Sequence, residues 1–236
     1  MKEINHPEIG LVIFKKNKRS RRITLRVKPN GHVTVSMPIL SFYRQAERLL
    51  LQNISWIKKQ QNKYSKRNQQ NKLTYNSSFK VRHKTLTISP TNKVNLQLKI
   101  KKNNIEIEVP TIWDFEESNI QSKIQDAIIK ALRIESKNYL PQHTRYIAQK
   151  NGIKINDIRI KKIKSRWGSC SIKKNINLSL YLMLLPDELI DYVIYHELAH
   201  IKHQNHSAKF WEHLEVLYPG AKKLDKQMKQ YHIPFA

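Results

Sequence analysis

The sequence has little or none of three features that would each place it in a particular class of protein. It contains one cysteine, Cys170, so no disulfide can form within the chain. No apolar run approaches the roughly 18 residues that a membrane-spanning helix needs. The first ten residues lack the basic, apolar and small segments of an export signal. We therefore expect a cytoplasmic protein with no membrane partner.

Acidic residues are also scarce, with 18 Asp and Glu against 44 Lys and Arg, giving a net charge of +26. Such a charge attracts polyanions, and nucleic acid above all. The alternative is a lysine-rich composition that only keeps the protein in solution. The basic residues are spread along the chain, and the densest group comprises Lys15, Lys16, Lys18, Arg19, Arg21 and Arg22. If the charge is functional, this group is expected to contribute most to binding.

The first half of the chain is predicted to be rich in β-structure. Its 236 residues suffice for one large domain or two small ones. Apolar and polar residues alternate over Ile23–Val27 and Val33–Val35, on either side of Asn30 and Gly31, which predicts a hairpin. The spacing becomes helical from Phe42 to about Lys66, and strand-like segments follow as far as Val109. We therefore expect a β-rich region with one long helix over residues 1–112.

Helices and strands are mixed over residues 113–236. A helical pattern runs from about Glu116 to Gln149, and Pro141 is expected to bend or interrupt it. Two strand-like segments precede a helix predicted from Asp187 through Ile201, and two shorter helices follow, separated at Pro219 and Gly220. No internal repeat is recognised. The expected fold class is α+β, with a domain boundary near residue 112.

A metal-binding pattern lies in the predicted helix that ends near Ile201. His196 and His200 are four residues apart, so a helix places their imidazoles on one face, where both can bind one zinc ion at roughly 2.0–2.1 Å. Glu197 is turned by about 100° from His196 and can reach a water at the ion without taking a coordination position. This H-E-x-x-H arrangement predicts zinc-dependent hydrolysis with Glu197 as the catalytic base.

The third zinc ligand is predicted to be His206, with His203 as the competing candidate. A catalytic zinc takes three protein ligands and keeps one position open. Ser207 is a good helix N-cap and Phe210 gives the next helix an apolar side, so His206 lies at the rigid entry of that helix. His203 lies in the intervening turn and is expected to be a solvated loop residue. Cys170 as a fourth ligand would close the site.

These residues together resemble a known family. The block His196–His200 with His206, Phe210 and Trp211, and the preceding segment Arg166–Ser171, are similar to the bacterial YgjP-like metallopeptidases, in the wider group of the Wss1-like and SprT-like proteases. The resemblance is dense from about Ile158 to the end and loose between about Lys66 and Asn151. It implies a zincin-like domain over residues 113–236, the same three histidine ligands and base, and peptides or proteins as substrates.

The segment Arg166, Trp167, Gly168 and Ser169 is the candidate substrate-binding region. The segment Arg166–Ser171 is expected to be a strand–turn–strand unit, and in zincin-like folds a strand beside the active-site helix pairs with extended substrate. Gly168 would let a backbone approach closely. Packing of Trp167 and Cys170 in the core, with Gly168 required by a turn, is the alternative. Arg166 and Tyr195 are candidates for a second electrophile.

Two further hypotheses about function stay open at this level. One is a peptidase that acts on proteins associated with nucleic acid, which the charge and the wider resemblance both favour. The other is a non-hydrolytic, zinc-stabilised module that binds nucleic acid. A purely structural zinc site has no use for Glu197, so the presence of that residue favours the enzyme.

Overall fold

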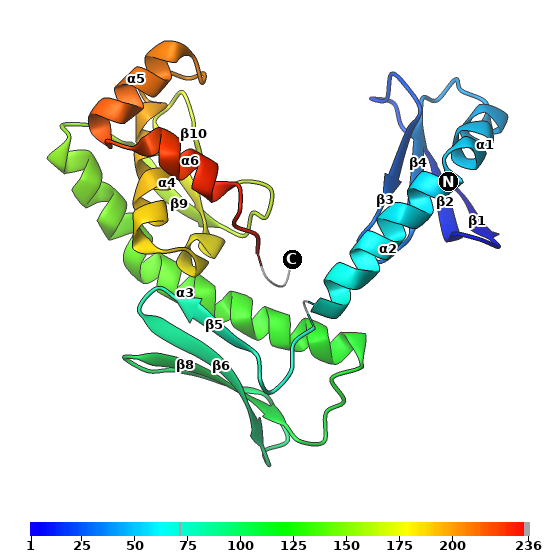
Figure 1. Ribbon diagram of the computed structural model, residues 1–236, viewed down its shortest axis with the longest axis horizontal. Helices are drawn as coiled ribbons and strands as arrows, with labels where there is room; N and C mark the ends of the chain where they lie inside the picture. Colours follow the sequence, from blue (N-terminus) through cyan, green and yellow to red (C-terminus); the bar gives the residue numbers. More distant parts are fainter. Residues whose placement is uncertain (71, 234–236) are drawn as a thin grey trace. The chain divides into compact units, whose positions relative to one another are not determined.

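The computed structural model describes residues 1–70 and 72–233 of the chain, and only the backbone of residues 67–70. The chain forms two compact units, Met1–Lys72 and Leu73–Ala236, here called unit 1 and unit 2 (Figure 1). The boundary expected near residue 112 falls inside unit 2, between a sheet and the helix that packs on it. None of the described helices combines the length and the apolar character needed to cross a membrane.

Unit 1 is a four-stranded sheet followed by helical segments. Its described elements are β1 (Lys2–His6), β2 (Gly10–Lys16), β3 (Thr24–Val27), β4 (Val33–Met37), α1 (Tyr43–Gln52) and α2 (Ile54–Gln70). The predicted hairpin is confirmed, with Thr24 opposite Ser36. The single long helix expected from Phe42 onward is divided at Asn53, whose side-chain amide donates a hydrogen bond to the Leu49 carbonyl at 2.7 Å.

The core of unit 1 lies on one face of this sheet. The strand order is β1-β2-β4-β3. Alternate side chains of β2 and β4, such as Phe14 and Val35, are fully buried and pack with Leu50 of α1 and Ile57 of α2. The opposite face carries Lys15 and other exposed side chains. The sheet therefore gains its stability from one face only, as the period of two in its sequence requires.

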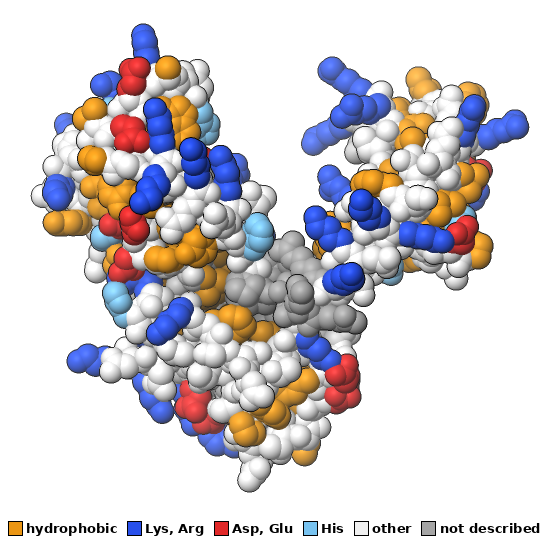
Figure 2. Space-filling model, in the orientation of Figure 1, with side chains coloured by type: hydrophobic (Ala, Val, Ile, Leu, Met, Phe, Trp, Pro, Cys, Tyr) orange, Lys and Arg blue, Asp and Glu red, His pale blue; other side chains and the backbone are white. Residues whose placement is uncertain are grey.

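Basic side chains dominate the surface of unit 1. Residues 1–72 include 17 Lys and Arg but only 3 Asp and Glu. In Figure 2 the part of the molecule that carries α1 and α2 shows many blue side chains and little red. The excess positive charge of the chain is thus densest in its smaller unit.

Unit 2 contains two sheets and the remaining helices. Its described elements are β5 (Ser78–Val81), β6 (Lys84–Thr91), β7 (Gln97–Ile100), β8 (Asn104–Pro110), α3 (Ser118–Lys150), β9 (Asp157–Lys161), β10 (Gly168–Cys170), β11 (Asn175–Ser179), the 3-10 helix η1 (Leu180–Leu184), α4 (Asp187–Ala199), α5 (Ala208–Leu217) and α6 (Ala221–Met228). Helix α3 is continuous through Pro141, so of the two expected outcomes, a bend or an interruption, the interruption is wrong. Burial of Leu140 and Thr144 on either side of the proline holds the helix together.

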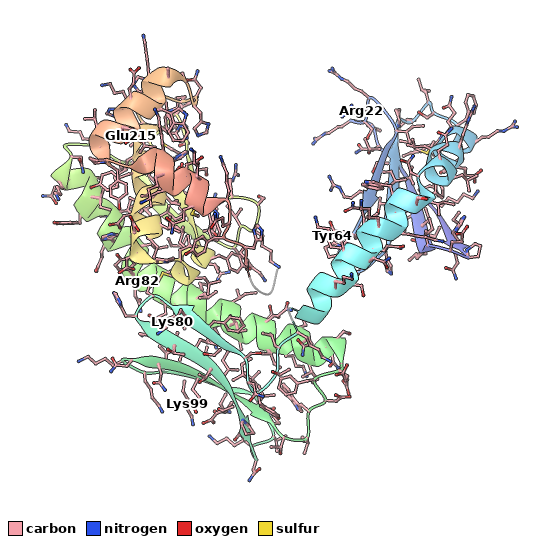
Figure 3. All side chains as sticks on the ribbon, viewed as in Figure 1. Arg22, Tyr64, Lys80, Arg82, Lys99 and Glu215 are labelled. Carbon is pink, nitrogen blue, oxygen red and sulfur yellow. The ribbon has the colours of Figure 1, made fainter. Side chains whose placement is uncertain are left out.

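The first sheet of unit 2 repeats the sheet of unit 1, although no repeat was recognised in the sequence. Its order is β5-β6-β8-β7, and in both sheets the central pair is parallel and the outer pairs are antiparallel. Figure 3 shows Lys80 and Lys99 on strands of the second copy. The pair Val12 and Val33 in the sheet of unit 1 corresponds to the pair Leu86 and Ile105 in the sheet of unit 2. The two sheets share the order and pairing of their strands and the alternation of buried and outward side chains. Their amino-acid sequences differ, so a comparison of residue identities does not reveal the repeat.

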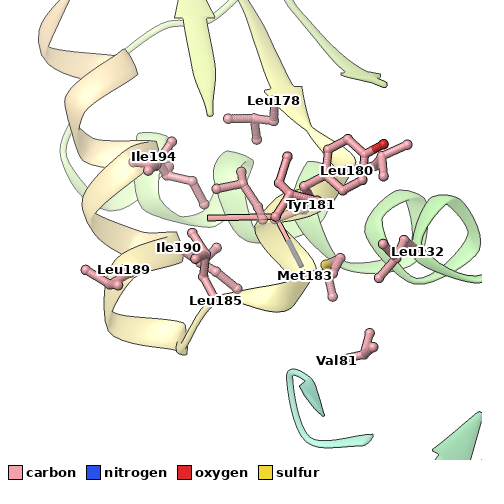
Figure 4. Close-up of a cluster of buried hydrophobic side chains, with 14 of the residues drawn as sticks. Val81, Leu132, Leu178, Leu180, Tyr181, Met183, Leu185, Leu189, Ile190 and Ile194 are labelled. Carbon is pink, nitrogen blue, oxygen red and sulfur yellow. The ribbon is translucent and has the colours of Figure 1, made fainter. Parts of the chain in front are cut away.

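One continuous core joins the elements of unit 2. Helix α3 contacts β7 and β8 as well as β9, η1 and α4. Around η1, Leu180 and Met183 lie among buried side chains that include Leu132 of α3, Val81 of β5 and Ile190 of α4 (Figure 4). The second sheet, in the order β10-β11-β9, completes this core. Helix α4 is thereby fixed by apolar packing along most of its length.

A pair of adjacent leucines tests the packing of unit 1. Leu50 is 1% exposed and Leu51 is 57% exposed. Leu50→Ala is expected to cost about 2–5 kcal/mol through lost burial and a residual cavity, and Leu51→Ala within about 0.5 kcal/mol. Hydrogen exchange followed by mass spectrometry should show faster exchange in peptides of unit 1 for the first variant only. Equal effects of the two substitutions would contradict this assignment of the core.

Candidate metal centre

Helix α4 begins at Asp187, as expected, and ends at Ala199, with His200 as its C-cap residue. Asp187 and Glu188 lie in its first turn, where their negative charges interact favourably with the positive end of the helix dipole. Val193 and Ile194 are buried, and their packing in the core fixes the rotation of α4 about its own axis. His196 and His200 are therefore presented together at its C-terminal end.

Three histidines meet at this end of α4. Nitrogen atoms of His196, His200 and His206 all lie within 4.8 Å of one another. The Nε2 atoms of His196 and His206 are 2.9 Å apart. The ring centroids are 4.9 Å apart for His196 and His200, and 4.7 Å for His200 and His206. The structure thus brings the three predicted ligands to one point.

The Phe210 ring packs against the rings of all three histidines. It is fully buried in α5, and its ring centroid lies 5.0 Å from that of His196, 4.6 Å from that of His200 and 4.9 Å from that of His206. Ser207 is the N-cap residue of α5, as predicted, although its side chain makes no capping hydrogen bond. His206 is aimed by its position directly before this helix.

The outer nitrogens of His196 and His200 are held by hydrogen bonds. The Tyr192 hydroxyl donates to Asp225 at 3.0 Å, so it accepts the proton of His196 Nδ1 at 3.3 Å. His200 Nδ1 donates to the His203 carbonyl at 3.0 Å. Both contacts place the proton on Nδ1 and leave Nε2 free for a metal, which is how second partners orient histidine ligands.

The histidines are electrically suited to bind a cation. Burial, reinforced by the neighbouring His200 and His206, lowers the pKa of His196 to about 4. Burial also lowers the pKa of His200. Both rings are therefore neutral at pH 7, as ligation requires. Imidazole nitrogens of three histidines at short separation are the donor set of a catalytic zinc with an open fourth position.

His203 contributes through its backbone. Its ring centroid lies 5.6 Å from that of His213, and its side chain is not part of the histidine cluster. Its carbonyl oxygen, in contrast, holds His200. The sequence indicated neither this role nor the contribution of Asp225. Tyr192 could have been found, because it precedes His196 by one helical turn.

Glu197 lies beside the cluster in an apolar environment. Its side chain is 5% exposed, and its Oε2 atom has no hydrogen-bond partner among the described residues. Burial raises the pKa of Glu197 to about 8, and the positive charge of Arg166 opposes this rise. A buried carboxylate with a free oxygen beside a candidate metal centre is able to exchange protons with a reacting group.

The residues form one wall of a cleft with a volume of about 450 Å³. Arg166, Trp167, Gly168 and Ser169 line it together with the three histidines and Glu197. Gly168 lies in strand β10, so the alternative in which a turn requires this glycine is wrong. The close approach of Glu197 explains the glycine, because a Cβ at position 168 would lie 2.6 Å from Glu197 Oε1.

The remaining candidates occupy different positions. Cys170 also lines the cleft but lies outside the histidine cluster, and burial raises its pKa to about 11. Tyr195 is nearly buried and stacks on Tyr218, with ring centroids 4.7 Å apart. Of the two candidate electrophiles, only Arg166 is among the described residues that line the cleft.

Two solved structures of metallopeptidase zymogens are similar to part of this chain. The metallopeptidase zymogen abylysin of Pyrococcus abyssi is 26% identical, over 38% of this chain and 95% of its own, with a TM-score of 0.33. The zymogen jannalysin of Methanocaldococcus jannaschii is 30% identical, over 37% of this chain and 90% of its own, also with a TM-score of 0.33. No curated protein matches the chain.

A family model gives the more extensive match. The model of the YgjP-like metallopeptidase domain matches residues 21–231, which include the three histidines, Glu197 and the segment that lines the cleft. The match also extends into unit 1, so the family pattern is not confined to the metal centre. The chain belongs to the YgjP-like metallopeptidase family.

Proposed function

We propose that the protein is a zinc-dependent peptidase of zincin-like design, with His196, His200 and His206 as zinc ligands and Glu197 as general base. The observation that carries this proposal is the convergence of three histidine nitrogens within 4.8 Å beside a buried carboxylate that has an unpartnered oxygen. Structural zinc sites are closed by four protein ligands, whereas this cluster offers three and opens onto a cleft.

In the proposed hydrolysis of a peptide bond, the ion and the side chains of the cleft have different roles. A bound zinc ion would activate water and polarise the scissile carbonyl. Glu197 accepts a proton from the attacking water and delivers it to the amine that leaves when the C–N bond breaks. Its raised pKa suits this work, and a nearby cation would bring that pKa down towards neutrality. Arg166 is the side chain of the cleft suited to stabilise developing negative charge.

Strand β10 is the proposed site for an extended peptide. It is an edge strand, paired with β11 through Gly168 and Leu178, and its residues line the cleft. A peptide can add to such an edge by backbone hydrogen bonds, which recognise any extended chain. Gly168 leaves room for Glu197 at the point where this peptide would lie. Peptides or unfolded protein segments are therefore the proposed substrate class.

The metal assignment is tested by comparing His206→Ala with His203→Ala. The first substitution removes a ligand and is expected to weaken zinc binding by more than about 100-fold, while the second keeps the backbone carbonyl that holds His200. Chelator competition and metal analysis of the purified proteins measure both. If His203→Ala loses the ion and His206→Ala keeps it, the third ligand is wrong.

Glu197→Gln separates the peptidase from a non-hydrolytic zinc module. The substitution keeps the size of the side chain and removes the base, so zinc content and thermal stability should stay near wild type. Cleavage of a casein or peptide substrate is expected to fall by about 10²–10⁴-fold. A zinc-loaded variant that retains activity within a few-fold of wild type would sink the proposed mechanism.

Gly168→Ala tests the contact between β10 and the base. The new Cβ would lie 2.6 Å from Oε1, 2.7 Å from Cγ and 2.8 Å from Cδ of Glu197, so the carboxylate must move. We expect kcat/KM to fall by about 100-fold with zinc retained, because small displacements of a positioned group are costly. Ser169→Ala on the same strand is the control and should cost little. Equal losses for both variants would argue against a specific role of position 168.

A further inference from the structure

The two copies of the repeated sheet differ on the face that lies away from the core. In unit 1 this face, here called the open sheet face, carries Leu11, Ile13, Lys15, Thr24, Arg26, Thr34 and Ser36. The strand registers give each position an equivalent in unit 2. Arg26 pairs with Thr34 in unit 1, and the equivalent pair in unit 2 is Lys99 with Glu106. Thr24 pairs with Ser36 in unit 1, and the equivalent pair in unit 2 is Gln97 with Glu108.

In unit 2 the basic side chains around Glu106 and Glu108 on the corresponding face are paired with these acids. Lys99 pairs with Glu108, and Lys93 lies 3.8 Å from the same carboxylate. Lys101 lies 3.5 Å from Glu106. Each basic side chain of this group therefore has an acidic partner close by.

In unit 1 hydroxyl side chains replace the acids, Arg26 keeps the positive charge of Lys99, and Lys15 adds a positive charge at the position of Ser89. Thr34 and Ser36 occupy the positions of Glu106 and Glu108. The acid on this face is Glu3 at the edge strand β1, three strands from Arg26 or roughly 14 Å. The other acids of residues 1–72 are already paired, Glu8 with Lys58 and Glu47 with Lys2.

We propose that the open sheet face binds the phosphate backbone of nucleic acid. Exposed Lys15 and Thr24 lie on either side of Ser36, and Arg26 follows on the same face of β3. Cationic and hydroxyl side chains are the groups that most often contact phosphates. The loop after β2 extends the positive charge beyond the sheet with Lys18, Arg19, Arg21 and Arg22, all exposed. Arg22 is labelled in Figure 3, on the segment leading to β3.

The same charge could attract an anionic membrane, which makes vesicles the necessary second ligand. Leu40 is 91% exposed and Phe42 is 72% exposed in unit 1, and both could enter a lipid surface. The apolar side chains on this face, Leu11 and Ile13, are only partly exposed, whereas Lys15, Thr24 and Arg26 are exposed. The face therefore offers little of the apolar area that gives membrane-binding surfaces their affinity. Nucleic acid is therefore the ligand that this face fits better.

Ser36→Glu transfers the charge-balancing feature of unit 2 into unit 1. It places a carboxylate at the position equivalent to Glu108, between Lys15 and Thr24. Binding of a labelled DNA duplex of about 30 base pairs to the full chain would be followed by fluorescence anisotropy over about 50–300 mM salt. We expect affinity to fall about ten-fold and the salt dependence to become shallower. Ser36→Gln, which has the same shape without the charge, should stay within about two-fold of wild type.

A second pair of variants keeps the proposal testable if Ser36→Glu does not fold. The double substitution K15Q/R26Q should reduce the slope of log affinity against log salt by about 2, because each residue contacts one phosphate. K99Q/K101Q removes the same charge from the equivalent face of unit 2 and should leave the slope unchanged. None of these residues lines the metal cleft, so peptidase activity reports separately on the proposed function.

Three results would overturn the proposal. Equal losses from Ser36→Glu and Ser36→Gln would show that charge on this face is irrelevant. Equal changes in slope from K15Q/R26Q and K99Q/K101Q would assign binding to the diffuse charge of the chain. Binding to phosphatidylserine vesicles that follows the expected ranking of the variants, without binding to DNA, would identify a membrane as the ligand.

Discussion

Burial of His196 and Glu197 at the C-terminal end of α4 is the constraint on which the proposed chemistry depends. Packing of α4 in the core of unit 2, the β10 strand beside Glu197 and the Phe210 ring against the histidines together produce this burial. The same burial has opposite effects on the two kinds of side chain. It keeps the imidazoles of His196 and His200 neutral, so that they can bind a cation, and it makes the Glu197 carboxylate a stronger base.

The repeated sheet shows how one backbone arrangement supports two environments. In both copies, buried side chains alternate with outward ones in the same register, so packing restricts only half of each strand. In unit 2 the helix after the sheet is long and also contacts the elements around the metal centre. The outward positions are free of such restrictions, and the charges of the two copies diverge there.

Features with a local cause were predictable from the sequence, and those that depend on distant contacts were not. The hairpin at Asn30 and Gly31, the start of α4 at Asp187 and the spacing of the histidines all follow from short-range periodicity. The continuity of α3 at Pro141 and the β conformation of Gly168 depend on tertiary packing. The Asp225 partner of Tyr192 lies 33 residues away, so no local pattern could identify it.

The order of ligands along the chain has a kinetic consequence. His196 and His200 belong to the end of one rigid helix, whereas His206 stands at the entry of another and is the exposed member of the three. Two nitrogens are therefore fixed before an ion arrives, and the third completes the site from the solvent side. If the three histidines bind the proposed ion, its entry and exit would depend most on the position of His206 before α5, while its affinity would depend on all three residues.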